Sequence, residues 1–274
     1  MLEQKDLSQM LETAIVAANL AGRLAMKEIS HLKVSVKNNN EYVTQADARC
    51  QQVIIDRIKK IYPHHGFIAE EGKQGGIFKQ PPKNNEPYWW VIDPIDGTNN
   101  FAHQMFLFTV SIAVMYQGEP IVGAIFDPAT ESIFTAVKNG KAQLNTRRMA
   151  VSEDKINKFS SIGLDSSFDN GVPAWARQIM KRTRYRNLGT TALQFAYVAS
   201  GGLVATLVSC AKLWDIAAGA LIVESAGGII TDWKGKKIFP VDTNNYQGGE
   251  FHALAANKKV HGEIIKLLST NNEL

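Results

Sequence analysis

From about residue 150 onward, short apolar segments alternate with segments of helical character, and this alternation constrains the fold more than any other feature. We expect strands in the segments FSSIGLD, YRNLG, LVATLVS, GGIITDW and HALAAN. We expect helices in PAWARQIMK, TALQFAYVAS, WDIAAGALIVESA and KVHGEIIKLL. Because strands that alternate with helices build α/β folds, the second half of the chain is predicted to be α/β.

The first half has a different pattern. Apolar residues recur every three or four positions from Leu7 to Ile29, which predicts a long amphipathic helix. A second helix is expected over VTQADARCQQVIIDRIKKIYP, with Pro63 at its end. Short turns separate the apolar segments YWWVID, FTVSIAVMY, PIVGAIFDP and SIFTAVK, as is typical of antiparallel hairpins. We interpret the chain as one domain over residues 1–274, with an α+β first half (about 1–150) and an α/β second half (about 151–274).

The composition argues against several classes of protein. The 274 residues carry a net charge of only +4, so the charge does not predict a nucleic-acid partner. No apolar run approaches the ~20 residues of a membrane span, and the polar N-terminus MLEQKDLSQM does not resemble a signal peptide. Two isolated cysteines, Cys50 and Cys210, suit a reducing compartment. We therefore expect a cytoplasmic protein.

The segment WVIDPIDGTNNFAH carries the strongest chemical signal. Asp93 and Asp96 stand at the end of an apolar strand, where an unpaired buried charge costs several kcal/mol. Carboxylates in this position need a counter-charge, and a hard divalent cation prefers such oxygen ligands. Gly97 and Thr98 then open a turn or helix whose N–H groups suit an anion. One loop thus offers ligands for a metal and donors for a phosphate, although Asp, Pro and Gly also form ordinary turns.

Other acidic residues stand at the ends of predicted elements. Glu70 and Glu71 end a short strand, while Asp47 and Asp215 lie at the starts of helices. Each has a simpler explanation, because acidic residues commonly cap helices or lie on exposed loops. Their shared position at element ends is what favours convergence on one site.

Together these segments carry a resemblance to a known family. The motifs VTQAD, AEEG, WVIDPIDGTNNF, GTTA and WDIAAG, in this order, are similar to those of the inositol monophosphatase family. The similarity runs over nearly the whole chain. It implies an α-β-α-β-α layered sandwich of the inositol monophosphatase / fructose-1,6-bisphosphatase type, and usually a homodimer. It also implies hydrolysis of a small phosphate monoester, such as inositol monophosphate or a related sugar or polyol phosphate, with lithium sensitivity.

The resemblance also assigns residues. It implies about two or three Mg²⁺ ions per site. The implied metal ligands are Glu70, Asp93, the carbonyl group of Ile95, Asp96 and Asp215. In the implied mechanism Thr98 and Asp47, with Glu70, orient a metal-activated water that attacks phosphorus directly. The implied substrate and phosphate contacts are Asp96, Gly97, Thr98, Gly189, Thr190, Thr191 and Asp215. Thr190 or Thr191 is equally suited to be a helix N-cap, and Lys37 falls near a family lysine beside the metals.

One position departs from the family pattern. Inositol-selective members have a glutamate that binds ring hydroxyls seven residues before the WD aspartate, and Val208 stands there in this chain. A valine accepts no hydrogen bonds, so inositol selectivity is not implied, and weak discrimination between alcohols is expected. A 3′-phosphoadenosine-type nucleotidase and a histidinol-phosphate phosphatase therefore remain alternatives on the same scaffold.

A non-enzymatic alternative depends on a basic stretch. RQIMKRTRYR contains Arg177, Lys181, Arg182, Arg184 and Arg186. This stretch, residues 177–186, would suit RNA or an acidic protein, although surface charges are usually only solvated.

Overall fold

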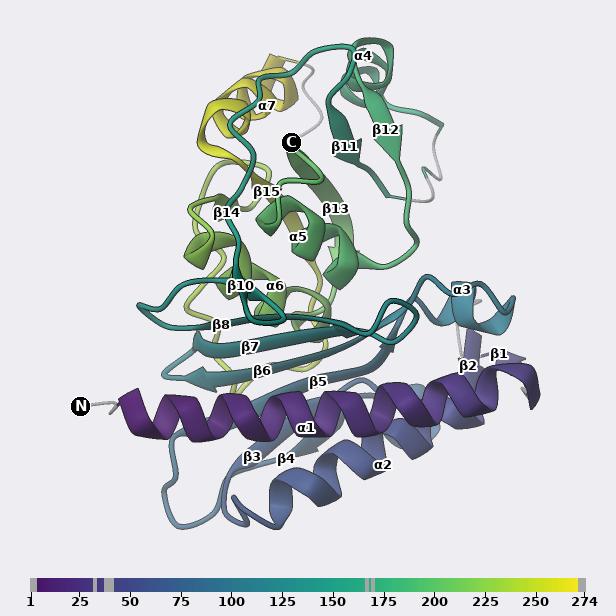
Figure 1. The fold of residues 1–274 in the computed structure, drawn as a ribbon, viewed down its shortest axis with the longest axis vertical. Helices are drawn as coiled ribbons and strands as arrows, with labels where there is room; N and C mark the ends of the chain where they lie inside the picture. Colours follow the sequence, from purple (N-terminus) through teal and green to yellow (C-terminus); the bar gives the residue numbers. More distant parts are fainter. Residues whose placement is uncertain (1–3, 32–33, 37–41, 166–167, 169–170, 271–274) are drawn as a thin grey trace.

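Two large β-sheets with helices between them frame the computed structural model in Figure 1. The structure describes residues 4–31, 34–36, 42–165, 168 and 171–270. The strands of the larger sheet are β3 (Gly66–Ala69), β4 (Phe78–Gln80), β5 (Tyr88–Asp96), β6 (Thr109–Tyr116), β7 (Glu119–Asp127), β8 (Ser132–Val137), β9 (Gln143–Leu144) and β10 (Arg147–Arg148). Their order is β10-β9-β8-β7-β6-β5-β3-β4. The pairs from β5 to β10 are antiparallel, as the hairpin spacing predicts, whereas β3 and β5 run parallel.

The smaller sheet belongs to the second half of the chain. Its strands are β11 (Ser161–Gly163), β12 (Arg184–Arg186), β13 (Ala205–Ala211), β14 (Ile229–Thr231) and β15 (Phe251–Ala256), in the order β12-β11-β13-β15-β14. β11 pairs in parallel with both β12 and β13. β15 pairs antiparallel with β13 and β14. The α/β prediction is thus confirmed, in a mixed sheet.

Helices alternate with the sheets in layers. The helices are α1 (Gln4–Glu28), α2 (Gln45–Lys59), α3 (Thr98–Ala102), α4 (Ala174–Arg182), α5 (Thr191–Ala199), α6 (Leu213–Ser225) and α7 (Lys258–Thr270), and short 3-10 turns occur at η1 (Ile29–His31) and η2 (Lys73–Gly75). The remaining strands β1 (Val34–Val36) and β2 (Tyr42–Thr44) pair with each other. α1 and α2 cover one face of the larger sheet, α5 and α6 lie between the sheets, and α4 and α7 lie on the far side of the smaller sheet. This is the expected α-β-α-β-α sandwich.

Three apolar cores hold the layers together. Alternate residues of β5 face opposite sides, so that Trp90 packs under α1 and α2 while Val91 joins the core around α5 and α6. This middle core also contains Phe195 of α5 and Ala253 of β15, so both halves of the chain contribute to it. On the outer face, α1 packs close to β7 because Gly22 carries no side chain, and a Cβ there would lie 2.6 Å from the Phe126 ring.

The stretch 72–87 is rich in glycine and proline, a composition typical of a loop, yet it is not a simple loop. It contains β4, which pairs antiparallel with β3 at the edge of the larger sheet. An edge strand needs only one neighbour, so this short polar segment joins the sheet despite its glycines and prolines. Among the described residues, no helix combines the length and apolarity that a bilayer crossing needs. Cys50 and Cys210 are both free thiols.

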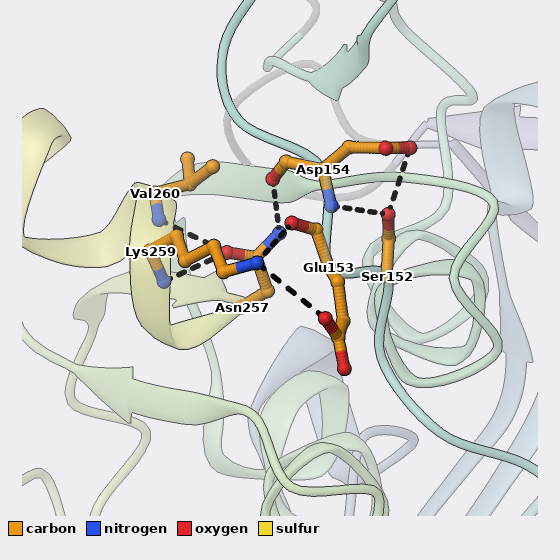
Figure 2. A network of polar contacts seen from close by, with 6 residues as sticks. All are labelled: Ser152, Glu153, Asp154, Asn257, Lys259 and Val260. Carbon is orange, nitrogen blue, oxygen red and sulfur yellow. Dashed lines mark hydrogen bonds and ion pairs between the residues drawn. The ribbon is translucent and has the colours of Figure 1, made fainter.

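A polar network ties the connection between the two halves to α7 (Figure 2). The Oδ1 atom of buried Asn257 accepts hydrogen bonds from the backbone N–H groups of Lys259 and Val260, both at 2.9 Å, and so caps α7. Its Nδ2 atom donates to the carbonyl oxygen of Asp154 at 2.9 Å. The Lys259 ammonium group contacts the exposed Glu153 on the same connection.

We predict that Asn257→Ala lowers the free energy of unfolding by about 1–3 kcal/mol, because it removes a helix cap and leaves buried backbone groups unpaired. Lys259→Ala is the control from the same network, and its exposed ion pair should contribute no more than about 1 kcal/mol. Urea unfolding followed by circular dichroism measures both, and one domain over residues 1–274 requires a single transition. Equal losses in the two variants would contradict the assigned role of Asn257.

Candidate active site

The ends of β3 and β5 place two acidic residues side by side. The strands are parallel with Ala69 opposite Ile92, and the Glu70 N–H donates to the Ile92 carbonyl oxygen at 3.3 Å. Glu70 therefore follows β3 beside Asp93. The β5–β6 register shifts between Asp93 and Asp96, where Pro94 interrupts the ladder. This irregularity keeps both aspartates at the end of the strand, as the sequence predicts.

Two further aspartates occupy equivalent positions at helix starts. Asp47 is the third residue of α2, and its Oδ2 atom accepts hydrogen bonds from the Thr44 N–H at 2.8 Å and the Thr44 hydroxyl at 2.6 Å. Asp215 is the third residue of α6, and it accepts the Lys212 N–H at 2.7 Å. Both are helix-capping residues, as the simpler explanation predicts. Both also contact the other site residues, so capping and convergence occur together.

Asp47 is in contact with the threonine of the acidic loop. The Thr98 Oγ1 atom lies 3.3 Å from Asp47 Oδ1 and 3.0 Å from the Ile95 carbonyl oxygen. A hydroxyl group has one proton to donate, so it donates to one acceptor at a time. Asp47 is fully buried. The Asp47–Thr98 pair expected from the resemblance is therefore present as a spatial contact.

Asp96 joins this loop to α5. Its Oδ2 atom accepts hydrogen bonds from the Ala192 N–H at 2.7 Å, from the Thr109 hydroxyl at 3.3 Å and from the Thr190 hydroxyl, and its Oδ1 atom accepts the Thr191 N–H at 3.1 Å. Thr190 is also the N-cap of α5, since its Oγ1 atom accepts the Leu193 N–H. The start of α5 thus receives the anion that its N–H groups and dipole favour.

Two glycines allow these segments to meet. Gly97 and Gly189 both have positive φ angles, 100° and 66°. A Cβ on Gly97 would lie 3.1 Å from the Gly189 carbonyl oxygen, and one on Gly189 would lie 2.7 Å from Asn100 Nδ2. Asn100 in turn donates to the carbonyl oxygens of Leu107 and Leu188 at 2.7 Å each. Asn100 is a positioning residue that the motif analysis missed.

The acidic residues repel one another. Burial, and then the charges of Glu70, Asp96, Asp215 and Asp47, raise the pKa of Asp93 well above its usual range. Burial and the charge of Asp96 raise the pKa of Asp215 to about 7, although part of its side chain faces the hollow. The hydrogen bond from the Lys212 N–H group to Asp215 acts in the opposite direction and lowers the pKa of Asp215. Burial also raises the pKa of Asp96, against the lowering effect of its hydrogen bonds.

Two adjoining hollows open at these residues. One has a volume of about 450 Å³, and its lining includes Glu70, Asp93, Ile95, Asp96, Gly97, Thr98 and Asp215. The other, of about 230 Å³, includes Asp96, Gly189, Thr190, Thr191 and Asp215. They share Asp96, Cys210 and Asp215. Apart from Asp47, which lies behind Thr98, every predicted site residue lines one of them.

The smaller hollow contains residues that the motifs did not reveal. These are Asp165, Asn187, Gln194, Ser209, Cys210 and Ala211. Val208, expected at the alcohol side of the site, has no exposed surface and packs in the middle core. The β13–β15 register shifts between Val208 and Ala211, and beyond it Ser209, Cys210 and Ala211 line the hollow. Val208 therefore does not line the hollow, and most of the residues that do are polar.

Two other sequence features lie apart from the hollows. The basic residues of the stretch 177–186 are exposed on α4 and β12, and none of them lines either hollow. Arg182 pairs with Glu263 of α7. Lys37 lies outside the described residues.

The donor set fits a hard cation. Glu70, Asp93, Asp96 and Asp215 offer carboxylate oxygens whose mutual repulsion a divalent ion would relieve. In the described part of the chain, no three acidic, histidine or cysteine side chains are already arranged around a single point as metal ligands. Asp96 is turned towards α5 and Asp215 towards Lys212. The chemistry of the set suits a hard divalent cation.

Comparisons with known proteins agree with this fold. The profile of the inositol monophosphatase family matches residues 6–273. The Nus factor SuhB of Pseudomonas aeruginosa is 35% identical over 84% of this chain and 88% of its own length. The inositol-1-monophosphatase of Mesorhizobium japonicum is 33% identical over 83% and 87%. The solved structure of the Thermotoga maritima IMPase is 31% identical, with a TM-score of 0.84 over 97% of this chain and 98% of its own.

The repulsion between the acids predicts a pH-dependent stability of the metal-free protein. The pKa of Asp215 is raised from 3.8 to about 7 in the folded state, so folding favours its protonated form. This stability is complete below the unfolded pKa and is lost as the pH rises through the folded pKa. We expect the melting temperature in EDTA to fall between about pH 4 and about pH 7, and to fall less steeply in Asp215→Asn. Glu153→Gln, an exposed acid outside the site, is the charge-matched control, and equal slopes in all three proteins would contradict the assignment.

Proposed function

Since this chain belongs to the inositol monophosphatase family, we propose that it is a Mg²⁺-dependent phosphatase that hydrolyses a small phosphate monoester by direct attack of water. The observation that carries the proposal is the convergence of Glu70, Asp93, Asp96 and Asp215 on one hollow, beside the Asp47–Thr98 pair. Family membership supports the phosphatase reaction. The particular monoester is the finer part of the proposal.

We assign the carboxylates of Glu70, Asp93, Asp96 and Asp215, with the carbonyl group of Ile95, as the residues that would hold Mg²⁺. About two or three ions are expected from the family resemblance. When bound, Mg²⁺ supplies positive charge for the phosphate and lowers the pKa of a coordinated water. These residues fit the ion because burial and mutual repulsion destabilise their charged carboxylates, and a divalent cation would offset both effects.

The chain's own residues would orient the reactants. The Thr98 hydroxyl, held by Asp47, is placed to orient the attacking water and to pass its proton to Asp47, whose second oxygen remains bound to Thr44. Glu70 is a further acceptor on the same hollow. The N–H groups at Gly97 and Thr98, and the segment Gly189 to Thr191, suit the phosphate and the adjoining part of the substrate.

A second candidate function comes from the relatives. Proteins named Nus factor SuhB from Pseudomonas aeruginosa and Escherichia coli are 35% identical to this chain. A non-enzymatic function, such as RNA binding, would use the exposed stretch 177–186. Within it, Arg184, Tyr185 and Arg186 all lie on the edge strand β12. RNA binding that weakens with salt, and weakens further in Arg184→Ala/Arg186→Ala, would support it. We place it second, because those residues are separate from the acidic hollow.

Three properties stay proposals from the resemblance and the composition. The homodimer and lithium sensitivity follow from the family resemblance. A cytoplasmic location is supported by the two free cysteines.

The proposed reaction requires the acidic set. Phosphate release from a panel of monoesters with Mg²⁺ tests the activity, and adding lithium to the same assay tests inhibition. We predict that Asp93→Asn lowers turnover by about 100-fold or more and shifts the Mg²⁺ requirement upward, because it removes a ligand charge at the centre of the set. Asp127→Asn, at the buried end of β7, is the matched control and should retain activity. Near-normal turnover of Asp93→Asn at low Mg²⁺ would reject the ligand assignment.

Thr98 and Asp47 should act as a unit. We predict that Thr98→Ala lowers kcat by about 100-fold or more with little change in KM, because the hydroxyl acts on the water and not on substrate binding. Asp47→Asn should have a similar effect, and the double variant should lose little more than either single variant. Melting temperatures separate this from the role of Asp47 as a cap of α2. Additive losses in kcat would mean that the residues act independently.

A further inference from the structure

The long connection between β14 and β15 forms one wall of the larger hollow. It runs over residues 232–250, and Gln247, Gly248 and Glu250 line the hollow. Gly248 lies against the segment before β4, since a Cβ there would lie 3.1 Å from the Ile77 side chain. Connections longer than about 12–15 residues are uncommon in compact domains and are often functional. This connection therefore calls for a role beyond joining two strands.

Tyr246 joins the connection to the start of α6. Its Oη atom accepts a hydrogen bond from the Leu213 N–H group at 3.0 Å and donates to the Gly249 carbonyl oxygen at 2.8 Å. Tyr246 is 7% exposed, and its ring packs edge-on against Trp214 with 6.3 Å between the ring centroids. The Leu213 N–H group belongs to the first turn of α6, where N–H groups have no acceptor within the helix. Tyr246 thus supplies an acceptor that the helix itself lacks.

The same turn of α6 carries Asp215, which is the third residue of the helix. A second contact fixes this turn, because the Ser111 hydroxyl group donates to the Trp214 carbonyl oxygen at 3.1 Å. Ser111 lies on β6 opposite Asp93. Ser111 therefore holds the helix start against the strands that carry Asp93, while Tyr246 holds it from the connection 232–250.

Two lysines from other elements anchor the connection. Lys79 of β4 donates hydrogen bonds to the carbonyl oxygens of Asn244 at 2.7 Å and Tyr246 at 2.8 Å. The Lys212 ammonium group donates to the Gly248 carbonyl oxygen at 3.0 Å. Hydrogen bonds from a charged donor are stronger than those between neutral groups. The connection is therefore held in place at both sides of Tyr246, and it keeps the Tyr246 hydroxyl group beside α6.

We propose that Tyr246 is a positioning residue for metal binding, which fixes the first turn of α6 through the Leu213 N–H group and so holds the Asp215 carboxylate at the larger hollow. This inference rests on the proposed function, because Asp215 acts there as a ligand of a divalent cation. Asp93, Asp96 and Asp215 repel one another, so an unfixed first turn would let the Asp215 carboxylate move away from the others. Fixing the turn in advance lowers the cost of gathering the ligands when the cation binds.

Mn²⁺ binding to the whole chain tests this role without any substrate, since Mn²⁺ takes the same oxygen ligands as Mg²⁺. Electron paramagnetic resonance of the free ion gives the dissociation constant. We expect Tyr246→Phe to raise this constant by about fivefold or more, because phenylalanine keeps the ring but leaves the buried Leu213 N–H group without an acceptor. Unchanged Mn²⁺ affinity in Tyr246→Phe would overturn the proposal.

Two further variants complete the binding experiment. Lys79→Met leaves α6 and Tyr246 unaltered but removes an anchor of the connection, so it should raise the Mn²⁺ dissociation constant by about two- to fivefold. It decides the proposal if Tyr246→Phe does not fold. Tyr88→Phe is the matched control, because Tyr88 begins β5 at the end away from Asp93. It should bind Mn²⁺ as the wild type does, and a loss equal to that of Tyr246→Phe would contradict the proposal.

Turnover gives an independent readout. Tyr246→Phe should need about fivefold more Mg²⁺ for half-maximal turnover, while kcat at saturating Mg²⁺ should return to within about twofold of the wild type, because excess cation compensates for the weaker site. A general loss of packing would instead lower kcat at every Mg²⁺ concentration, and that result would also overturn the proposal.

The outcomes separate this inference from the proposed function. Weaker Mn²⁺ binding in Tyr246→Phe, together with a wild-type protein that hydrolyses no monoester, would refute the phosphatase reaction and retain the role of Tyr246. Hydrolysis by the wild type, with unchanged Mn²⁺ affinity in the variant, would refute the role of Tyr246 alone. A wild-type protein that binds no Mn²⁺ would refute both.

Discussion

The carboxylate of Asp96 seated on the start of α5 is the contact on which the arrangement of the hollows depends. It joins the end of β5, from the first half of the chain, to a helix of the middle layer from the second half. The unpaired N–H groups and dipole of a helix start favour a negative charge there. Gly97 and Gly189 let the two segments approach closely. Asn100 of α3 stabilises the same contact, because its Nδ2 atom donates a hydrogen bond to the Leu188 carbonyl oxygen. Asp96 lines both hollows, so this contact holds the two hollows side by side.

Holding several carboxylates in one place opposes folding, and the structure offsets this cost locally. Asp47, Asp93 and Asp215 each accept a backbone N–H group, from Thr44, Ile95 and Lys212. These neutral donors stabilise the carboxylates but leave the repulsion between them, which the raised pKa of Asp93 reflects. The middle core, to which both halves contribute, holds the acidic residues in place. The same repulsion that lowers the stability of the metal-free protein therefore favours a cation.

The sequence predicts the fold and the site correctly where the signal lies in nearby residues. The period of α1, the hairpins of the larger sheet and the acids at element ends all follow from nearby residues, and the motif order identifies the layered fold. It fails where a contact depends on strand order. β4 is short and polar, and only its edge position beside β3 makes it a strand. Asp165 and Ser209 are 44 residues apart, and only the parallel pairing of β11 with β13 brings them together. Val208 was assigned to the alcohol side from its spacing alone, and the register shift after it leaves it in the core.

The two hollows take most of their residues from different elements. The acids come from the ends of β3 and β5 and from the starts of α2 and α6, whose positions are set by capping and by the larger sheet. The smaller hollow adds residues from the end of β13 and from just beyond β11, in the smaller sheet. The motifs that carry the family resemblance include the proposed metal ligands of the larger hollow, whereas none of them includes Asp165 or Ser209. For this reason family membership predicts the reaction of such a chain better than it predicts the alcohol.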